Sequence, residues 1–120
     1  MFKVIVAGSR EFNEFEVLRD KLDHLLKGKV AEGEGIEIVS GGCRGVDMMG
    51  EKYARLRGYK VKRFNANWKK YGKSAGYLRN SEMGKYGDAL VTFWDGKSKG
   101  TKMMIEIGEK EGMKVRVVRV

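Results

Sequence analysis

The chain alternates between short apolar runs and longer segments in which apolar residues recur every three or four positions. Short, mostly apolar and β-branched runs predict strands that are buried in a sheet. They cover residues 2–7 (FKVIVA), 36–40 (IEIVS), 59–64 (YKVKRF), 88–93 (DALVTF) and 114–120 (KVRVVRV). The third run carries charge at alternate positions, which indicates a strand near an edge of the sheet.

Apolar residues at helical spacing separate these strands. The first such stripe follows Asn13 and Glu16, whose spacing is that of a capping box, so we expect this helix to begin at Asn13 and to end near Gly28. A second stripe starts at Val46 and is closed by Gly58 as the C′ residue. Further helices are expected over 74–85 and 100–111, with a polar and aromatic irregular stretch over 65–73.

The predicted order of elements is βαβαβ, a loop, and then αβαβ. Regular alternation of this kind is typical of an α/β fold with a mostly parallel sheet and right-handed crossovers. A length of 120 residues suits one domain with one core, and no repeat, linker or low-complexity tract divides the chain. We therefore predict a single three-layer α/β domain over residues 1–120, with a sheet of about five strands flanked by helices.

The composition excludes several kinds of chemistry. Cys43 is the single cysteine and His24 the single histidine, which rules out an internal disulfide and a multi-cysteine metal site. A Ser/His or Cys/His nucleophile pair would need His24 close in space. We expect neither a metal nor a cofactor. No apolar run approaches the ~18–20 residues of a membrane span, and the first run is too short for a signal sequence, so we expect a cytoplasmic protein without a membrane partner.

The positive charge of the chain is concentrated in one segment. The net charge is +9, and residues 55–85 contain ten basic residues and one acid, whereas the remainder balances. The aromatic residues of this segment are Tyr59, Phe64, Trp68, Tyr71 and Tyr77. Basic residues interleaved with aromatic ones are typical of surfaces that bind nucleic acid. The alternative is a solvated basic face above aromatic residues of the core.

Three loops with small or polar residues follow predicted strands. They are Gly8–Arg10, Ser40–Asp47 and Asp95–Thr101. Ligands of open parallel sheets bind beyond the carboxyl ends of the strands, and glycine-rich loops at helix N-termini offer backbone N–H groups to phosphate. Neither the dinucleotide fingerprint nor the P-loop pattern is present. The loops predict a phosphate site at this edge of the sheet, and the alternative is that the glycines only form tight strand-to-helix turns.

The candidate ligand-binding residues come from these loops and from the helix expected at 74–85. Arg10 and Arg44 are candidates for pairing with phosphate, or are solvated surface residues. Asp47 either accepts a ribose hydroxyl or complements the dipole of its helix, and Ser98 either contacts the ligand or only caps a helix. Cys43 has no evident base and is expected to be inert. The full set is Gly8, Ser9, Arg10, Gly41, Gly42, Arg44, Gly45, Asp47, Arg79, Asn80, Asp95, Ser98, Gly100 and Thr101.

Five blocks of the sequence resemble the YspA/cpYpsA-related branch of the SLOG superfamily. They are GSREF, SGGCRGVDMMGEKYA, FNANWKKYGKSAGYLRNSEM, DALVTFWDGKSKGT and the closing strand, in the same order over nearly the whole chain. The resemblance implies a Rossmann-like domain that senses or processes a nucleotide-derived ligand, often in phage and bacterial conflict. Members of the superfamily include the LOG-type phosphoribohydrolases and the DNA-binding DprA/Smf proteins.

The resemblance also implies candidate catalytic residues. LOG-type enzymes cleave the N-glycosidic bond of a nucleoside monophosphate with an arginine and with the glutamate of a Gly-Gly-x-Gly-Thr-x-x-Glu motif. Arg79 matches the arginine, and Gly100 and Thr101 match the Gly-Thr pair. The glutamate position is occupied by Met104, and Glu106 follows on a different helix face. Arg79 and Glu106 are therefore the candidate catalytic pair.

Three functions are compatible with these patterns. The first is binding of a nucleotide-derived, phosphate-containing small molecule at the carboxyl edge of the sheet. The second is hydrolysis of its glycosidic bond by Arg79 with an acid, which would be Glu106, Asp47 or Asp95. The third is DprA-like binding of single-stranded nucleic acid through the basic segment 55–85. Because relatives often dimerise through helices, we also expect a homodimer or a higher homo-oligomer.

Overall fold

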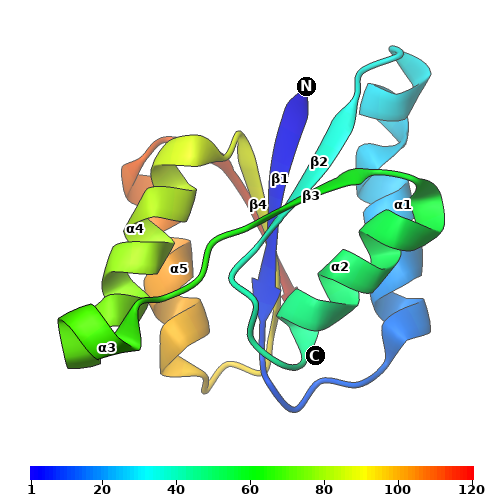
Figure 1. Cartoon of the computed structure of the whole chain (residues 1–120). Helices are drawn as coiled ribbons and strands as arrows, with labels where there is room; N and C mark the ends of the chain where they lie inside the picture. Colours follow the sequence, from blue (N-terminus) through cyan, green and yellow to red (C-terminus); the bar gives the residue numbers. More distant parts are fainter.

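The computed structural model describes residues 1–120 and contains one five-stranded sheet between two layers of helices (Figure 1). All neighbouring strands are parallel, and their order is β3-β2-β1-β4-β5. The strands are β1 (Phe2–Gly8), β2 (Ile36–Ser40), β3 (Lys60–Arg63), β4 (Ala89–Trp94) and β5 (Lys114–Arg119). The predicted three-layer α/β domain is confirmed. The strand order reverses between β1 and β4, and this is where open α/β sheets bind ligands.

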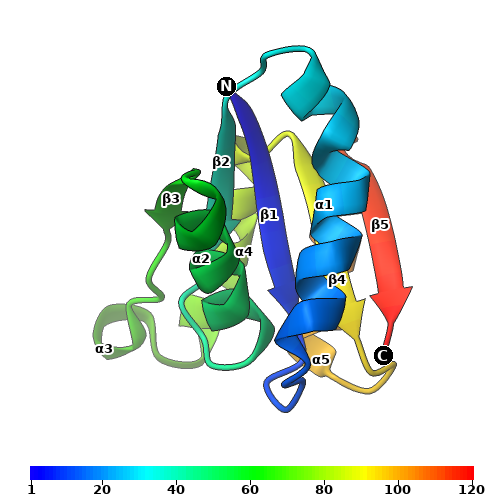
Figure 2. The same ribbon diagram turned by 90° about the vertical axis from the view of Figure 1, so that its right-hand side faces the viewer.

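Helices cover both faces of the sheet. They are α1 (Phe15–Ala31), α2 (Val46–Arg57), α3 (Trp68–Tyr71), the 3-10 helix η1 (Gly72–Ser74), α4 (Ala75–Tyr86) and α5 (Lys99–Lys110). Helices α1 and α2 lie on one face, and α4 and α5 on the other (Figures 1 and 2). None of the helices combines the length and the apolar character that a membrane span requires.

The core is divided into two halves by the sheet, and successive residues of β1 show how. Val4 and Val6 pack with Leu18 and Leu22 of α1, whereas Ile5 packs on the other face among residues of α4 and α5. All of these side chains are fully buried. Because both faces are covered, the central strands are apolar at most positions, and each buried aliphatic side chain stabilises the fold by about 1.5–3 kcal/mol.

The two edges of the sheet are protected by charge. All four residues of β3 are exposed, which confirms the predicted edge position of this strand. The opposite edge is β5, which carries Lys114, Arg116 and Arg119. Lysine and arginine along an edge strand oppose pairing with a further strand. A homo-oligomer that extends the sheet is therefore disfavoured, and the oligomer expected from the sequence stays a prediction that would have to use the helical surfaces.

The start of α1 differs from the prediction. The helix begins at Phe15, so Glu14 occupies the N-cap position, and it does so without a side-chain hydrogen bond. The capping box of Asn13 and Glu16 does not form, because both residues are shifted by one position relative to the helix start. The entry into α1 is stabilised instead by packing, since Phe12 and Phe15 lie against the core on the α1/α2 face.

The end of α1 and the segment before α4 also differ in detail. Helix α1 continues past Gly28 to Ala31, and the chain turns at Gly33, which has a φ of 77°. An internal glycine costs a helix about 1 kcal/mol, which the burial of Leu26 outweighs. The stretch 65–73, expected to be irregular, contains α3 and the first residues of η1. The predicted stop at Gly58 is confirmed by its left-handed conformation, with a φ of 75°.

Candidate functional site

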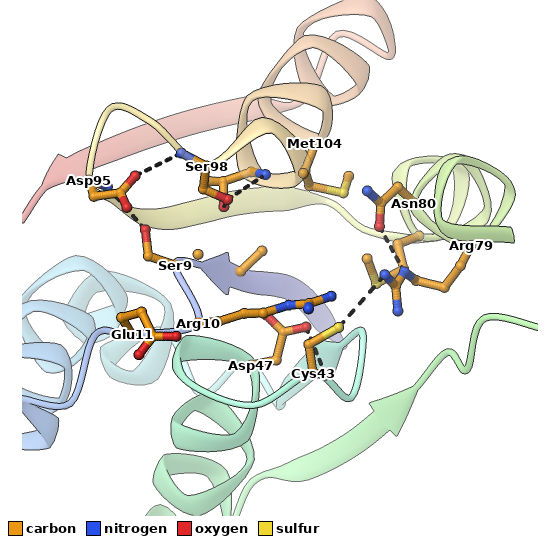
Figure 3. Close-up of a pocket in the computed structure, with 15 residues that line it drawn as sticks. Ser9, Arg10, Glu11, Cys43, Asp47, Arg79, Asn80, Asp95, Ser98 and Met104 are labelled. Atoms are coloured by element: carbon orange, nitrogen blue, oxygen red, sulfur yellow. Dashed lines mark hydrogen bonds between the residues drawn. The ribbon is translucent and has the colours of Figure 1, made fainter. Parts of the chain in front are cut away.

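A pocket of about 350 Å³ opens beyond the carboxyl ends of β1 and β4, at the reversal of strand order (Figure 3). Its walls come from the loops after β1, β2 and β4, from the start of α2, and from α4 and α5. Most of the residues proposed from the sequence line it. They are Gly8, Ser9, Arg10, Asp47, Arg79, Asn80, Asp95, Ser98, Gly100 and Thr101. Gly41, Gly42, Arg44, Gly45 and Glu106 are not among the lining residues.

The loop after β1 is locked against β4. A Cβ atom on Gly8 would lie 2.2 Å from the carbonyl oxygen of Phe93, so only glycine allows the two strands to end this close together. Ser9 is buried, and its backbone N–H donates to the same carbonyl at 3.0 Å. The Ser9 hydroxyl accepts the backbone N–H of Asp95 at 3.1 Å. The first and third predicted loops therefore form one wall of the pocket.

The loop after β4 leads into an open helix N-terminus. The Asp95 carboxylate accepts the N–H groups of Lys97 and Ser98, both at 2.8 Å, and these bonds lower the pKa of Asp95. Ser98 caps α5 by accepting the N–H of Thr101, while the two hydroxyls lie 3.0 Å apart. The predicted role of Ser98 as a helix cap is confirmed. Its position in the pocket wall also leaves its hydroxyl close to any bound ligand.

Two backbone N–H groups at the start of α5 have no acceptor within the protein. They belong to Lys99 and Gly100, the first residues of the helix. A Cβ atom on Gly100 would meet no atom within 4 Å, so the backbone there is open. The positive end of the helix dipole adds to these donors, and no acid lies in the first turn. The arrangement favours an anion.

The loop after β2 binds several of its own N–H groups internally. The N–H of Gly42 donates to the Ser40 hydroxyl at 3.0 Å, and that of Cys43 donates to the Asp47 carboxylate at 3.2 Å. The N–H of Val46, the first residue of α2, donates to the carbonyl oxygen of Ser9 at 3.3 Å. These contacts use three N–H groups of the loop, whereas those of Arg44, Gly45 and Asp47 have no acceptor in the protein. Its geometry is that of a tight strand-to-helix turn.

The glycines of this loop make room for neighbouring atoms. Gly45 has a φ of 82°, and a Cβ there would lie 2.5 Å from the carbonyl oxygens of Ser9 and Arg10. A Cβ on Gly41 would lie 2.9 Å from the Asp47 carboxylate and 3.0 Å from the Arg79 guanidinium. The glycines therefore bring α2 against the loop after β1, and the loop after β2 against α4.

Arg79 fastens α4 to the loop after β2. Its Nη1 donates to the carbonyl oxygen of Gly41 at 2.5 Å, and its Nε donates to the side-chain oxygen of Asn80 at 2.8 Å. Its Nη2 lies 3.9 Å from the sulfur of Cys43. The guanidinium is half-buried at the pocket wall (Figure 3). Arg79 therefore acts first as a structural clasp, and two of its five N–H groups keep no partner in the protein.

Asp47 is a buried acid in the pocket wall. Burial raises the pKa of Asp47 to about 6, although the Cys43 N–H and the charges of Arg79 and Arg10 oppose the increase. Arg10 extends across the pocket toward Asp47, and its guanidinium takes part in no hydrogen bond or ion pair (Figure 3). The charge of the pocket therefore becomes more positive as the pH falls through about 6.

Two of the proposed charged residues, Arg44 and Glu106, do not line the pocket. The Arg44 guanidinium pairs with the Glu11 carboxylate at 2.6 Å, and both side chains are largely exposed. Glu106 is exposed on α5, whereas Met104 of the same helix is buried in the pocket wall. Helical geometry separates positions 104 and 106 by about 200°, so a side chain that follows Met104 by two residues points away from it. The structure does not bring Glu106 to Arg79.

The pocket also contains residues that were not proposed from the sequence as ligand-binding residues. They are Ala7, Glu11, Cys43, Met83 and Met104. Met83 follows Arg79 by four residues, and Met104 follows Thr101 by three, so each shares a helix face with a proposed residue. That spacing was the available sequence pattern. Cys43 lies inside a loop whose neighbours were proposed, but its sulfur contacts only Arg79 here.

The strand order and the position of the pocket define a Rossmann-like α/β domain. Residues 2–71 match the model of the family described as YspA, cpYpsA-related SLOG family. The chain is also 34% identical over 122 residues to the Gene 61 protein of Mycobacterium phage D29, with 96% of this chain and 94% of that protein covered. The chain belongs to the YspA, cpYpsA-related SLOG family, as the sequence resemblance implied.

Two solved structures of DNA processing protein A (DprA) have a similar fold. The protein from Streptococcus pneumoniae superposes with a TM-score of 0.73 at 18% identity, covering 98% of this chain and 50% of that chain. The protein from Helicobacter pylori, described with a single-stranded DNA binding mode, gives 0.70 at 18% identity, with 97% and 64% covered. The chain thus spans between half and two thirds of these structures, and the likeness concerns the fold.

Proposed function

We propose that the protein binds a phosphate-bearing nucleotide unit in the pocket at the carboxyl edge of the sheet. The observation that carries the proposal is the start of α5, where the N–H groups of Lys99 and Gly100 have no protein acceptor. The hydroxyls of Ser98 and Thr101 lie beside them. Backbone N–H groups, hydroxyls and a helix dipole that converge on one open position are the features by which helix N-termini bind phosphate.

The remaining walls supply groups suited to the rest of a nucleotide. Arg10 has no partner in the protein and is free to pair with a second anionic oxygen. Asn80 is buried, and its side-chain NH₂ contacts only the sulfur of Met103, a weak acceptor, at 3.7 Å. It therefore keeps donor capacity for a base or a ribose. Met83 and Met104 provide apolar surface against which a flat ring packs.

Hydrolysis is the less supported function of this pocket. The position at which LOG-type enzymes carry a glutamate is Met104, and Glu106 lies outside the pocket. The Asp95 carboxylate is engaged by two backbone N–H groups. Asp47 is the acid nearest to Arg79, but it accepts the Cys43 N–H and is buried in the wall. The groups present suit retention of a nucleotide better than cleavage of its glycosidic bond.

A single strand of nucleic acid is the second candidate source of the nucleotide unit. The basic segment 55–85 exposes Trp68, Tyr71 and Tyr77 beside its lysines and arginines, as in surfaces that bind single strands. The likeness of the fold to DprA supports the strand over a free nucleotide. A free nucleotide and a strand present the same phosphate chemistry to the pocket, so the proposal holds for both and the experiment separates them.

The test compares nucleoside monophosphates, ADP-ribose, inorganic phosphate and a short oligothymidylate as ligands of the purified protein. Thermal shifts report binding to the native state, and fluorescence anisotropy reports binding of the labelled strand. Ser98→Asp keeps a residue that caps helices well but places negative charge where the phosphate would bind. We expect Ser98→Asp to leave the melting temperature of the free protein unchanged and to abolish binding.

The matched control is Lys114→Gln, which removes one positive charge at the opposite end of the sheet. It should bind like the wild type. If no ligand of the set binds the wild type, or if Ser98→Asp binds as well as the wild type, the proposed function is wrong. Chromatography of the incubated monophosphates tests the hydrolytic alternative, because free base is released only if the glycosidic bond is cleaved.

A further inference from the structure

A second hollow, of about 770 Å³, adjoins the pocket between the loop after β1 and α2. Arg10 and Glu11 line both the pocket and this hollow, so the two lie on either side of these residues. Besides Arg10, the cations of its wall are Arg44, in the loop after β2, and Lys52 and Arg55 of α2. The nucleotide site proposed above leaves this hollow without a role.

The hollow has an excess of unpaired positive charge. It contains four cations and one acid, Glu11, which is paired with Arg44. Arg10, Lys52 and Arg55 take part in none of the ion pairs of the structure. Cations on a solvated surface usually lie among acids of similar number, whereas a groove of one sign is the electrostatic footprint of a polyanion.

Aromatic side chains form part of the same wall. Phe12 and Phe15 both line the hollow and are half-buried. Phe12 stacks on Phe93 with ring centroids 5.9 Å apart, which holds its ring in place. Lys52 lies over the ring of Phe15, with the ammonium 4.3 Å from its centroid. Fixed rings beside cations are the combination with which proteins bind the bases and phosphates of a single strand.

We infer that this hollow is a second phosphate subsite for a single-stranded nucleic acid whose neighbouring nucleotide occupies the pocket. The inference rests on the proposed function, because it extends the ligand of the pocket through Arg10 into the hollow. A free mononucleotide would occupy the pocket alone. The shared residue Arg10 and the uncompensated charge favour a strand, and its phosphates would lie along the four cations of the hollow, Lys52 and Arg55 included.

Glu11 controls how much charge the hollow offers to the strand. Its carboxylate is bound to Arg44 at 2.6 Å, and the two side chains are 83% and 73% exposed. An exposed pair of this kind is worth at most about 1 kcal/mol, so a phosphate displaces the carboxylate readily. Removal of the carboxylate in Glu11→Gln frees Arg44. We expect this variant to bind the strand several-fold more tightly than the wild type does.

The experiment measures anisotropy of a labelled oligothymidylate at several salt concentrations. The double variant Lys52→Gln/Arg55→Gln removes two cations of the hollow that the pocket does not use. The control Lys110→Gln/Lys114→Gln makes the same change of charge at the opposite end of the sheet. Each phosphate contact of a single strand contributes about 0.7 to the slope of log affinity against log salt, so two lost contacts lower it by about 1.4.

The expected result is a reduced slope and several-fold weaker strand binding for the Lys52/Arg55 variant, with unchanged binding of a nucleoside monophosphate and no change in the control. Equal strand binding by the two double variants would overturn the inference while leaving the proposed function intact. Weaker or unchanged binding by Glu11→Gln contradicts the role of that residue. Absence of all nucleotide binding by the wild type would contradict the proposed function, and the inference with it.

Discussion

Two loops of this protein look alike in sequence and differ in structure. Ser40–Asp47 and Asp95–Thr101 both follow a central strand, contain glycine and lead into a helix. In the first, the N–H groups of Gly42 and Cys43 are bound by Ser40 and Asp47, and none of the loop's glycines lines the pocket. In the second, the N–H groups of Lys99 and Gly100 have no acceptor, and Gly100 lines the pocket. Glycine content alone therefore does not distinguish a tight turn from a phosphate-binding loop.

The two loops also differ in the position of their carboxylate relative to the helix that follows. Asp47 is in the first turn of α2, where its carboxylate places a negative charge and accepts the N–H of Cys43. The first turn of α5 contains no acid, and Asp95 binds N–H groups that precede the helix. An acid within the first helical turn is thus a feature, readable from the sequence, that disfavours a bound anion at that helix start.

The largest expected effect on stability comes from a side chain added to the loop after β2. Gly45→Ala places a Cβ 2.5 Å from two carbonyl oxygens at a φ of 82°. Backbone strain and overpacking together should lower the free energy of unfolding by about 4 kcal/mol. Urea denaturation monitored by circular dichroism measures the change. A loss below about 1 kcal/mol would contradict the close contact between this loop and the loop after β1.

The second effect concerns the carboxylate of Asp47, next to the loop after β2. The pKa of Asp47 is raised to about 6 in the native state, above its ordinary value of 3.8. Between these values the native state holds a proton that the unfolded state has released, so this group makes stability fall as the pH rises from about 4 to about 6. The shift corresponds to about 3 kcal/mol across that window.

Asp47→Asn keeps an acceptor for the Cys43 N–H and removes the titration. Relative to the wild type, the variant should gain stability steadily from pH 4 to pH 6 and keep a constant advantage above pH 6. Urea denaturation at several pH values provides the difference curve. A flat difference across this window would show that Asp47 does not titrate there.

The third effect measures the structural role of Arg79, which joins α4 to the loop after β2. Arg79→Met retains length and loses the bonds to the Gly41 carbonyl and to Asn80. The loss should cost about 2 kcal/mol. Because the charge of Arg79 also lowers the pKa of Asp47, the cost should be larger at pH 7.5, where Asp47 is ionised, than at pH 5. An equal cost at the two pH values would contradict the coupling of Arg79 to Asp47.

The smallest effect on stability is expected at the start of α5. Gly100→Ala adds a Cβ that meets no atom within 4 Å and replaces glycine by a better helix former. Stability should therefore rise by up to about 1 kcal/mol. The same Cβ limits the approach of a phosphate to the N–H groups of α5, so nucleotide binding should weaken. Thermal unfolding and ligand titration measure the two changes. Higher stability with unchanged binding would argue that the phosphate binds elsewhere.

Local sequence patterns were sufficient to predict the five strands, the four longer helices, their alternation and the edge of the sheet that holds the pocket, but they did not predict α3. These depend on local periodicity, so the apolar runs and the positions of Gly58 and Ser98 were sufficient. The capping box at Asn13 failed because a pattern of residue types places a helix start only to within a residue or two. The resemblance that placed the chain in its family rested on short blocks of sequence, which required no tertiary information.

Which of the neighbouring loop residues line the pocket depends on the tertiary packing. Arg10 and Arg44 were equivalent in the sequence, but packing of α2 against the loop after β1 turns Arg44 toward Glu11 and away from the pocket. Glu106 and Met104 are two residues apart, and the side of α5 that covers the sheet determined that Met104 is buried at the pocket. Such choices depend on contacts between segments far apart in the chain, which local sequence patterns do not encode.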